Sequence, residues 1–401
     1  MESAHILLAQ RVREARERLD LTQKELAEAA GFAAHQIVSQ IEKGERDVKA
    51  WELARLASAL SVNIQDLLGP VPIARPVVLW RDLPSQGAGV KEAKFLERYR
   101  RFCFVQRVTG SLPHIQAPSL RLPILQMTFR DAAELADVVR SVLDLGDRPA
   151  YALLEAAESQ FGIQIWYANL DHDGSAAAYV DSRGAAVLLS SVEPPWRRNF
   201  SFAHELFHVL TWDPEHPELI AVLKANRDLF DRNEKLANAF ASALLLPAEP
   251  IREELRKAVA GGGLTHASLV AIAGDFCVST QALLWRLVNM GVYRRDLVQA
   301  LLGDPQLNAL DAASRLGTWW DPSPLPRRFV YLCYLAWQQG HLSRSRLAEY
   351  LETHLADLDD CLAEYGLSAS DIGQNIDLSG IADANCFSLE DEEWPVIVPS
   401  A

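Results

Sequence analysis

The 401 residues are enough for about two or three domains, each with its own hydrophobic core. Hydrophobic residues make up 49% and charged residues 23%, which excludes an intrinsically disordered chain. The formal net charge of −14 argues against a protein that coats nucleic acid without selectivity, because such binding depends on neutralising phosphates. No apolar run reaches the length of a membrane span and the five cysteines form no CxxC pair, so we expect a cytoplasmic protein with reduced thiols and no membrane partner.

The stretch LTQKELAEAAGFAAHQIVSQIEKGER, residues 21 to 46, predicts two short helices separated by a turn. Thr22 and Glu25 form a capping box, which starts a helix near Gln23 that stops before Gly31. A second helix over about 34–43 ends at Gly44, and the pair is a helix-turn-helix. Flanking helices at about 4–19 and 49–60 close a small bundle, the second with four apolar side chains directed inward: Trp51, Leu53, Leu56 and Leu60.

This stretch resembles the phage-repressor-type (XRE) helix-turn-helix domains over about residues 5 to 69, through LTQKELAEAAG, SQIEKGER and LARLASALSVNIQDLL. The resemblance implies DNA binding, with Gln23 at the DNA backbone. Four residues would face the major groove: His35, Gln36, Ser39 and Gln40. The stretch from Gly31 to Ile41 has one residue more than the family usually has. The alternative is a domain that dimerises or binds a protein, because residues 1 to 69 hold nine Lys and Arg against eleven Asp and Glu.

A linker is predicted at residues 70 to 90, which are rich in proline and glycine. Helical patterns follow at 91–107 and about 130–143, so residues 71 to 145 are expected to form a linker and helical connector. The first of these patterns is locally basic. It is either a solvated helix face or a further contact to phosphates.

Two imidazoles and a carboxylate interrupt the apolar run RRNFSFAHELFHVL at residues 197 to 210. Residues four apart share one face of a helix, so His204 and His208 project together, and Glu205 lies beside them about 100° round the axis. This is the pattern HExxH, in which the histidines hold a metal ion and the glutamate reaches a water bound to it. The alternative is a pair of core histidines, with Glu205 paired to Arg197 or Arg198 because an unpaired buried carboxylate is costly.

A hydrolytic zinc site takes three protein ligands and keeps one open position. The long metzincin pattern is excluded by Thr211 and Pro214. Three downstream residues are candidates for the third ligand: His216, Asp231 and Glu234. Glu234 begins the helical pattern EKLANAFASALLLP, in which Glu234 and Asn238 are one turn apart. Both could face the metal, Glu234 as a ligand and Asn238 as the hydrogen-bond partner of a ligand histidine.

Together, RRNFSFAHELFHVL and EKLANAFASALLLP are similar to the ImmA/IrrE-type metallopeptidases, over about residues 146 to 292. The resemblance implies a thermolysin-like minimal zincin core that binds Zn²⁺ through His204, His208 and Glu234, with Glu205 as the catalytic base. It also implies that the strand GAAVLLSS, residues 184 to 191, lines the substrate cleft. Characterised members act on XRE-type repressors in stress, phage or mobile-element regulation.

The C-terminal third is expected to be helical. Residues 264 to 291 predict two helices about a turn, either a second helix-turn-helix or a pair that packs on the peptidase core. The acidic tail SLEDEEWPVIVPSA either occupies the chain's own cleft or is disordered. The expected fold is mainly α with a small β-sheet (α+β). We expect four regions: a helix-turn-helix at 1–70, the connector at 71–145, the metallopeptidase domain at 146–295 and a helical C-terminal region at 296–401.

Two functions from different classes fit these features. In the first, the chain is a zinc-dependent endopeptidase with a DNA-binding domain, and it cleaves a repressor or another regulatory protein. In the second, it is an XRE-family transcription regulator whose peptidase-like domain senses a signal with little or no proteolytic turnover. A homodimer is compatible with the sequence, which does not decide the oligomeric state.

Overall fold

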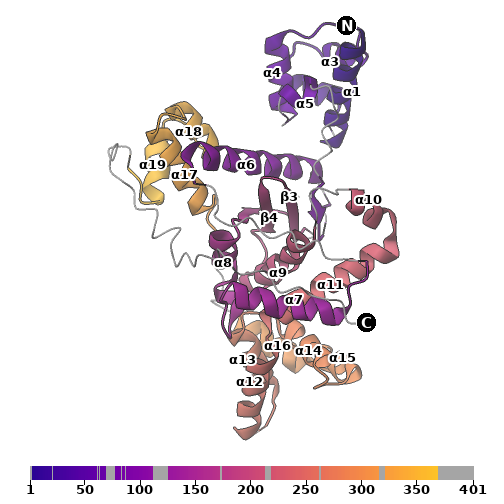
Figure 1. The fold of residues 1–401 in the computed structure, drawn as a ribbon, viewed down its shortest axis with the longest axis vertical. Coiled ribbons are helices and arrows are strands. Elements are labelled where there is room, and N and C mark those ends of the chain that lie inside the picture. Colours follow the sequence, from indigo (N-terminus) through magenta and orange to yellow (C-terminus); the bar gives the residue numbers. More distant parts are fainter. Residues whose placement is uncertain are drawn as a thin grey trace, which may run out of the picture. The chain divides into compact units, whose positions relative to one another are not determined.

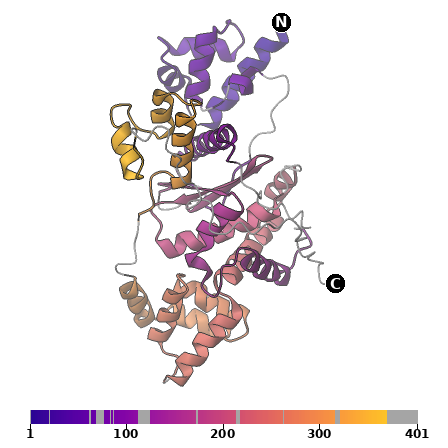
Figure 2. The same cartoon turned by 60° about the vertical axis from the view of Figure 1, so that its left-hand side comes forward.

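The structure is a computed structural model, and it describes residues 2–368 apart from 20, 61, 63, 69–76, 83, 86, 112–124, 172–173, 213–217, 262 and 316–320. Helices dominate, and one small sheet lies among them (Figures 1 and 2). The chain divides into two compact units. The first comprises residues 1–78 and 83–104, and the second comprises residues 79–82 and 105–401. The expected α+β class is confirmed.

The first unit contains the predicted helix-turn-helix. Its elements are α1 (Glu2–Arg18), α2 (Gln23–Ala29), α3 (His35–Glu42), α4 (Ala50–Ala59), α5 (Ile64–Leu68) and most of α6 (Ala88–Thr109). The capping box is present, because Thr22 Oγ1 accepts from the Glu25 amide and the Thr22 amide donates to Glu25 Oε2. Gly31 and Gly44 follow α2 and α3 at φ of 66° and 71°, which a residue without Cβ adopts without strain.

A buried ion pair fixes α1 against α3. Arg16 Nε and Nη2 donate to the two oxygens of Glu42 at 2.6 and 3.1 Å. Gln23 Nε2 also donates to Glu42, at 2.9 Å. Charge-assisted bonds of this fork geometry are stronger than neutral ones, so Glu42 ties the start of α2 and the end of α1 to α3.

One predicted core residue of this bundle is wrong. Leu53, Leu56 and Leu60 are buried as expected, but Trp51 is 51% exposed. Trp51 and Arg55 are one turn apart on the outer face of α4, and the Arg55 guanidinium lies 5.0 Å from the centre of the indole ring. The amphipathic pattern of α4 therefore begins at Leu53.

The second unit is built on a sheet with the order β1-β3-β4-β2. Its strands are β1 (Leu79–Trp80), β2 (Gln164–Ala168), β3 (Ala176–Asp181) and β4 (Gly184–Ser190). β4 is the strand expected at 184–191. It is antiparallel to β3 and parallel to β2, so both of its sides are paired. β1 was not expected, because it lies inside the stretch predicted to be a linker, and it pairs antiparallel with β3.

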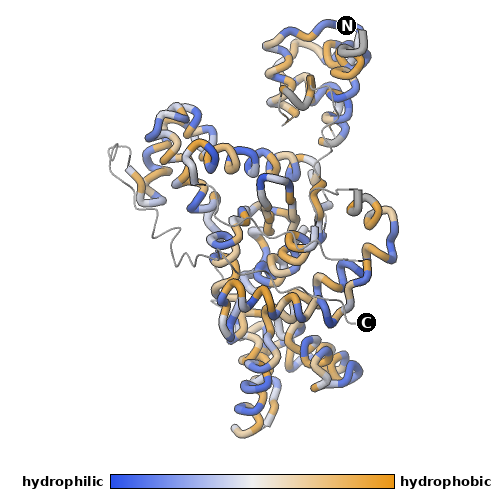
Figure 3. Tube along the Cα trace, in the orientation of Figure 1, coloured by the Kyte–Doolittle hydropathy of each residue, from blue (hydrophilic) through white to orange (hydrophobic). Residues whose placement is uncertain are grey.

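Helices cover this sheet and form the core. α9 (Pro195–Thr211) packs against β3 and β4, and α11 (Arg227–Leu245) packs between α9 and α7 (Phe129–Val142). Smaller elements complete this part: η1 (Pro149–Tyr151), α8 (Leu153–Gln160) and α10 (Glu218–Ala225). Phe202, Leu206 and Phe207 of α9 meet Phe240 and Leu244 of α11 in one buried cluster. Figure 3 shows the alternation of hydrophobic and hydrophilic residues along the helices that such packing requires.

The remaining helices are α12 (Ala248–Ala260), α13 (His266–Asp275), α14 (Thr280–Asn289), α15 (Arg295–Leu302), α16 (Pro305–Ser314), α17 (Arg327–Gln338), α18 (Arg344–Tyr350) and α19 (Leu358–Glu364). Leu269 and Phe276 of α13 and Leu283 and Leu287 of α14 belong to the same buried cluster as α9, which is the packing role predicted for this pair. Within the described part of the chain, no single helix is long and apolar enough to cross a membrane. Only α13 and α14 together pass that test of length and composition, and they are bent by 96°. The acidic tail lies outside the described residues.

Candidate metal site

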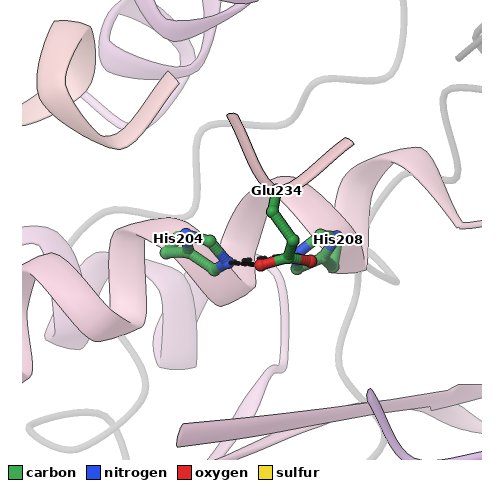
Figure 4. Close-up of side chains that lie close together, drawn as sticks. All are labelled: His204, His208 and Glu234. Carbon is green, nitrogen blue, oxygen red and sulfur yellow. Dashed lines mark hydrogen bonds and ion pairs between the residues drawn. The ribbon is translucent and has the colours of Figure 1, made fainter. Parts of the chain in front are cut away.

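The site is formed by two helices that pack against each other. α9 starts at Pro195, a favoured first helical residue, and is apolar on most of its surface, so it is buried in the second unit. His204 and His208 project from one side of it, and Glu234 reaches between them from α11 (Figure 4). The helical spacing of four residues therefore places the imidazoles together, and the tertiary packing adds the carboxylate.

The three ligand atoms converge on one point. The two Nε2 atoms of His204 and His208 are 3.2 Å apart. Glu234 Oε2 is 3.0 Å from His204 Nε2, and Glu234 Oε1 is 3.3 Å from His208 Nε2. Among the described residues these are the only three His, Cys, Asp or Glu side chains that could hold a metal ion together. Asp231 is exposed and takes no part, and His216 lies outside the described residues.

The outward nitrogens of both rings have amide partners. His204 Nδ1 lies 3.1 Å from Asn238 Oδ1, as expected for a residue that orients a ligand. His208 Nδ1 lies 3.4 Å from Asn233 Nδ2, a contact that the sequence reasoning missed. Asn233 Oδ1 has no hydrogen-bond partner among the described residues. A half-turn of this amide would bring Oδ1 to the ring, so that Nδ1–H donates and Nε2 keeps its lone pair.

The Glu205 carboxylate is fully buried beside this cluster. Neither of its oxygens has a hydrogen-bond partner among the described residues. Arg197 pairs instead with Glu193 at 2.6 Å, and the Arg198 guanidinium lies over the ring of Tyr167. The arginine pairing of the core-histidine alternative is therefore wrong. Its oxygens are therefore available to a water or a substrate beside the cluster.

Burial sets the protonation of the site. Burial raises the pKa of Glu205 to about 8, so this carboxyl has a high affinity for a proton. Burial lowers the pKa of His204 to about 4, so its ring is neutral at pH 7. Burial would raise the pKa of Glu234, but its contacts with the two imidazoles outweigh burial and hold that pKa well below the usual range. An ionised carboxylate beside imidazole nitrogens is a donor set that binds divalent metal ions.

The residues expected to contact DNA lie on the first unit. His35, Gln36 and Gln40 are exposed on α3, and Ser39 is half-buried beside them. Gln23 is half-buried, and its amide nitrogen donates one hydrogen bond to Glu42. The exposed face of α3 is thus the part of the expected set that is open to a ligand.

Comparison with known families agrees with both halves of this structure. Residues 158–288 match the family described as IrrE N-terminal-like domain, and residues 12–67 match the family described as helix-turn-helix. A search of the curated proteins found no match. The fold and the site therefore define a DNA-binding regulator with a peptidase-like domain. More specifically, residues 12–67 form an XRE-type helix-turn-helix domain and residues 158–288 an IrrE-like domain.

Proposed function

We propose that the chain is a zinc-dependent endopeptidase that cleaves a repressor or another regulatory protein, and that its helix-turn-helix domain binds DNA. The observation that carries this proposal is the buried Glu205, whose oxygens have no hydrogen-bond partner in the described part of the chain, and which stands beside three converging ligands. A domain that only senses a signal has no need for a carboxylate in that position.

The donor set fits zinc in kind and in spacing. Zinc binds histidine nitrogen at about 2.0–2.1 Å, so two imidazoles on a tetrahedral ion are separated by about 3.3 Å. The observed separation of the two Nε2 atoms is 3.2 Å. Two nitrogens and one carboxylate also match the ligands of hydrolytic zinc sites, which keep a fourth position for water or substrate.

Each residue of the site has a defined part in hydrolysis. When bound, zinc polarises the scissile carbonyl and lowers the pKa of the attacking water. Glu205 accepts the proton of that water and delivers it to the leaving nitrogen of the substrate. Asn238 holds the His204 ring in the orientation that directs Nε2 toward Glu234.

Metal analysis and proteolysis test the proposal together. Purified wild-type protein should contain one zinc per chain, and Glu205→Gln should keep the zinc but produce no fragments of the XRE-type repressor encoded nearby. His204→Ala should lose both the metal and the activity. Glu155→Gln, at an exposed glutamate of α8, is the matched control and should behave as wild type.

Two results would reject the peptidase. One is a purified protein without stoichiometric zinc. The other is a repressor that stays intact, or that is cut equally by wild type and Glu205→Gln, with and without single-stranded DNA. Zinc without Glu205-dependent fragments would favour the transcription regulator with a sensory domain.

A further inference from the structure

The outer edge of β3 is held by the chain's own connector. β4 is paired on both sides, so β3 is the strand of the β2-β3-β4 core that has an outer edge next to α9. β1 pairs with this edge through Leu79 opposite Ala178 and Trp80 opposite Ala177. The Arg81 amide adds a bond to the Ala176 carbonyl at 3.0 Å. The segment thus adds to the sheet as a short antiparallel strand, the way an extended peptide adds to an exposed edge.

Two side chains of this segment are anchored on a buried polar network. Arg81 Nη1 donates to Ser201 Oγ at 2.9 Å, and Ser201 Oγ donates to Glu193 Oε2 at 3.1 Å. At the other end, Ser175 Oγ lies 2.8 Å from Asp82 Oδ2 and 2.9 Å from Glu193 Oε1. Glu193, Ser175 and Ser201 are all buried. These buried polar groups therefore form a binding site for the basic side chain of an extended segment that pairs with the outer edge of β3.

This binding site adjoins the metal site. Ser201 precedes Glu205 by one turn of α9, so both lie on the same side of the helix. Burial dominates the pKa values of His204 and Glu205, and the positive charge of Arg81 acts on both as well. Arg81 is therefore within electrostatic range of the groups that would carry out hydrolysis.

The β1 segment is also held weakly enough to dissociate from β3. The residues before and after it, 1–78 and 83–104, belong to the first compact unit. Only the four residues 79–82 of this stretch belong to the second unit. β1 itself is two residues long and half-buried, and its ladder bonds are correspondingly few. An incoming strand that offers the same backbone bonds can replace it at little net cost.

We propose that the outer edge of β3 is the docking edge for an extended polypeptide, and that Leu79–Asp82 occupies this edge as an intramolecular competitor which the polypeptide must displace. The favoured polypeptide carries an apolar and an aromatic residue followed by a basic one, the order found in Leu79, Trp80 and Arg81. That this polypeptide is the substrate rests on the proposed function, whereas its binding to the edge does not.

A disulfide across β1 and β3 tests the displacement. Leu79→Cys with Ala178→Cys places two thiols at directly opposed positions, and the native cysteines lie outside both strands. A fluorescent peptide of sequence VVLWRDL is titrated against the full chain carrying Glu205→Gln, so that nothing is cleaved. Oxidation should weaken binding by at least about tenfold, and a reductant should restore it. Leu79→Cys alone is the control and should not respond to oxidation.

Weakening the attachment of the β1 segment is the complementary test of displacement. Arg81→Ala removes the bond to Ser201 and should tighten peptide binding by about tenfold. Arg183→Ala is the matched control, because Arg183 pairs with Asp181 at the β3–β4 turn and should leave binding unchanged.

The outcomes separate the two proposals. Equal binding by the oxidised, reduced and Arg81→Ala forms, or binding by none of them, overturns the docking edge. Binding that the lock abolishes, without cleavage of any protein by the chain that retains Glu205, supports the docking edge and rejects the peptidase. Cleavage that is unaffected by the lock supports the peptidase and rejects the substrate as the polypeptide that docks on this edge.

Discussion

Asn238 Oδ1 lies 3.1 Å from His204 Nδ1, on the far side of the ring from the nitrogen that faces Glu234. This contact fixes both the tautomer and the direction of the ring, and loss of such partners typically weakens metal binding. We predict that Asn238→Ala lowers zinc affinity by about 10- to 100-fold, measured by competition with a chromophoric chelator. Lys235→Ala, on the exposed side of α11, is the control. Equal zinc affinity in both variants would contradict the assigned role.

Glu158 on α8 predicts a pH-dependent stability. Burial raises its pKa to about 7, against the opposing charge of Arg328, and its Oε1 has no hydrogen-bond partner among the described residues. A folded-state pKa above the unfolded value means that its contribution to stability is present below about pH 4 and is lost as pH rises toward 7. We expect Glu158→Gln to be more stable than wild type by about 3 kcal/mol at pH 8, and to show no such gain at pH 4.

Urea unfolding at both pH values measures this difference. The neighbouring Glu155→Gln serves as control, because Glu155 is exposed and its substitution should leave the free energy of unfolding unchanged. A pH-independent difference between Glu158→Gln and wild type would show that folding does not change the pKa of this carboxyl.

The Arg16–Glu42 pair should dominate the stability of the helix-turn-helix. The two side chains are 13% and 3% exposed, so Glu42→Ala removes the bidentate partner of a largely buried guanidinium, which keeps its contacts with the Leu21 carbonyl and Glu17. Breaking a buried pair in this way costs about 3–5 kcal/mol. Arg13→Ala removes the exposed pair with Glu17 and should have little effect on stability. Hydrogen exchange of the α2 and α3 amides reports on this unit alone, and similar protection in both variants would refute the prediction.

Gln36 and Gln40 should read DNA bases if the exposed face of α3 enters the major groove. A bidentate contact to a base contributes about 1–3 kcal/mol, so each alanine substitution should weaken binding to the chain's own promoter about tenfold or more. Gln299→Ala, at an exposed position of the second unit, should bind as wild type. The measurement is a titration at low salt, since the acidic chain has a small electrostatic contribution to DNA affinity. Undiminished affinity in Gln36→Ala and Gln40→Ala would mean that α3 binds another ligand.

The helices and the metal site could be predicted because their signals are local. Thr22 and Glu25 lie three residues apart, and the spacing of His204 and His208 follows the helical period. Glu234 could be found for the same reason, since it shares one turn of α11 with Asn238. Only the packing of α9 on α11 was needed to bring the two local patterns together.

Features that depend on distant partners could not be predicted. β1 is too short to show an alternation of apolar and polar residues, and its partner Ala177 is remote in sequence. The proline-rich stretch therefore gives no signal of a strand. Asn233 adjoins Glu234, but its contact with His208 depends on the crossing of two helices. Trp51 was placed inside because it is large and apolar, whereas its stacking with Arg55 provides an alternative on the surface.

The pairing of β1 with β3 also bears on how the protein can be dissected. A fragment that starts at residue 105 keeps the HExxH helix but removes β1, and the outer edge of β3 is left with unsatisfied N–H and C=O groups. Ser201 and Ser175 lose their contacts to Arg81 and Asp82 at the same time. Bare edges of this kind recruit other chains, so we expect such a fragment to self-associate and precipitate, whereas one that retains residues 77–82 should remain dispersed.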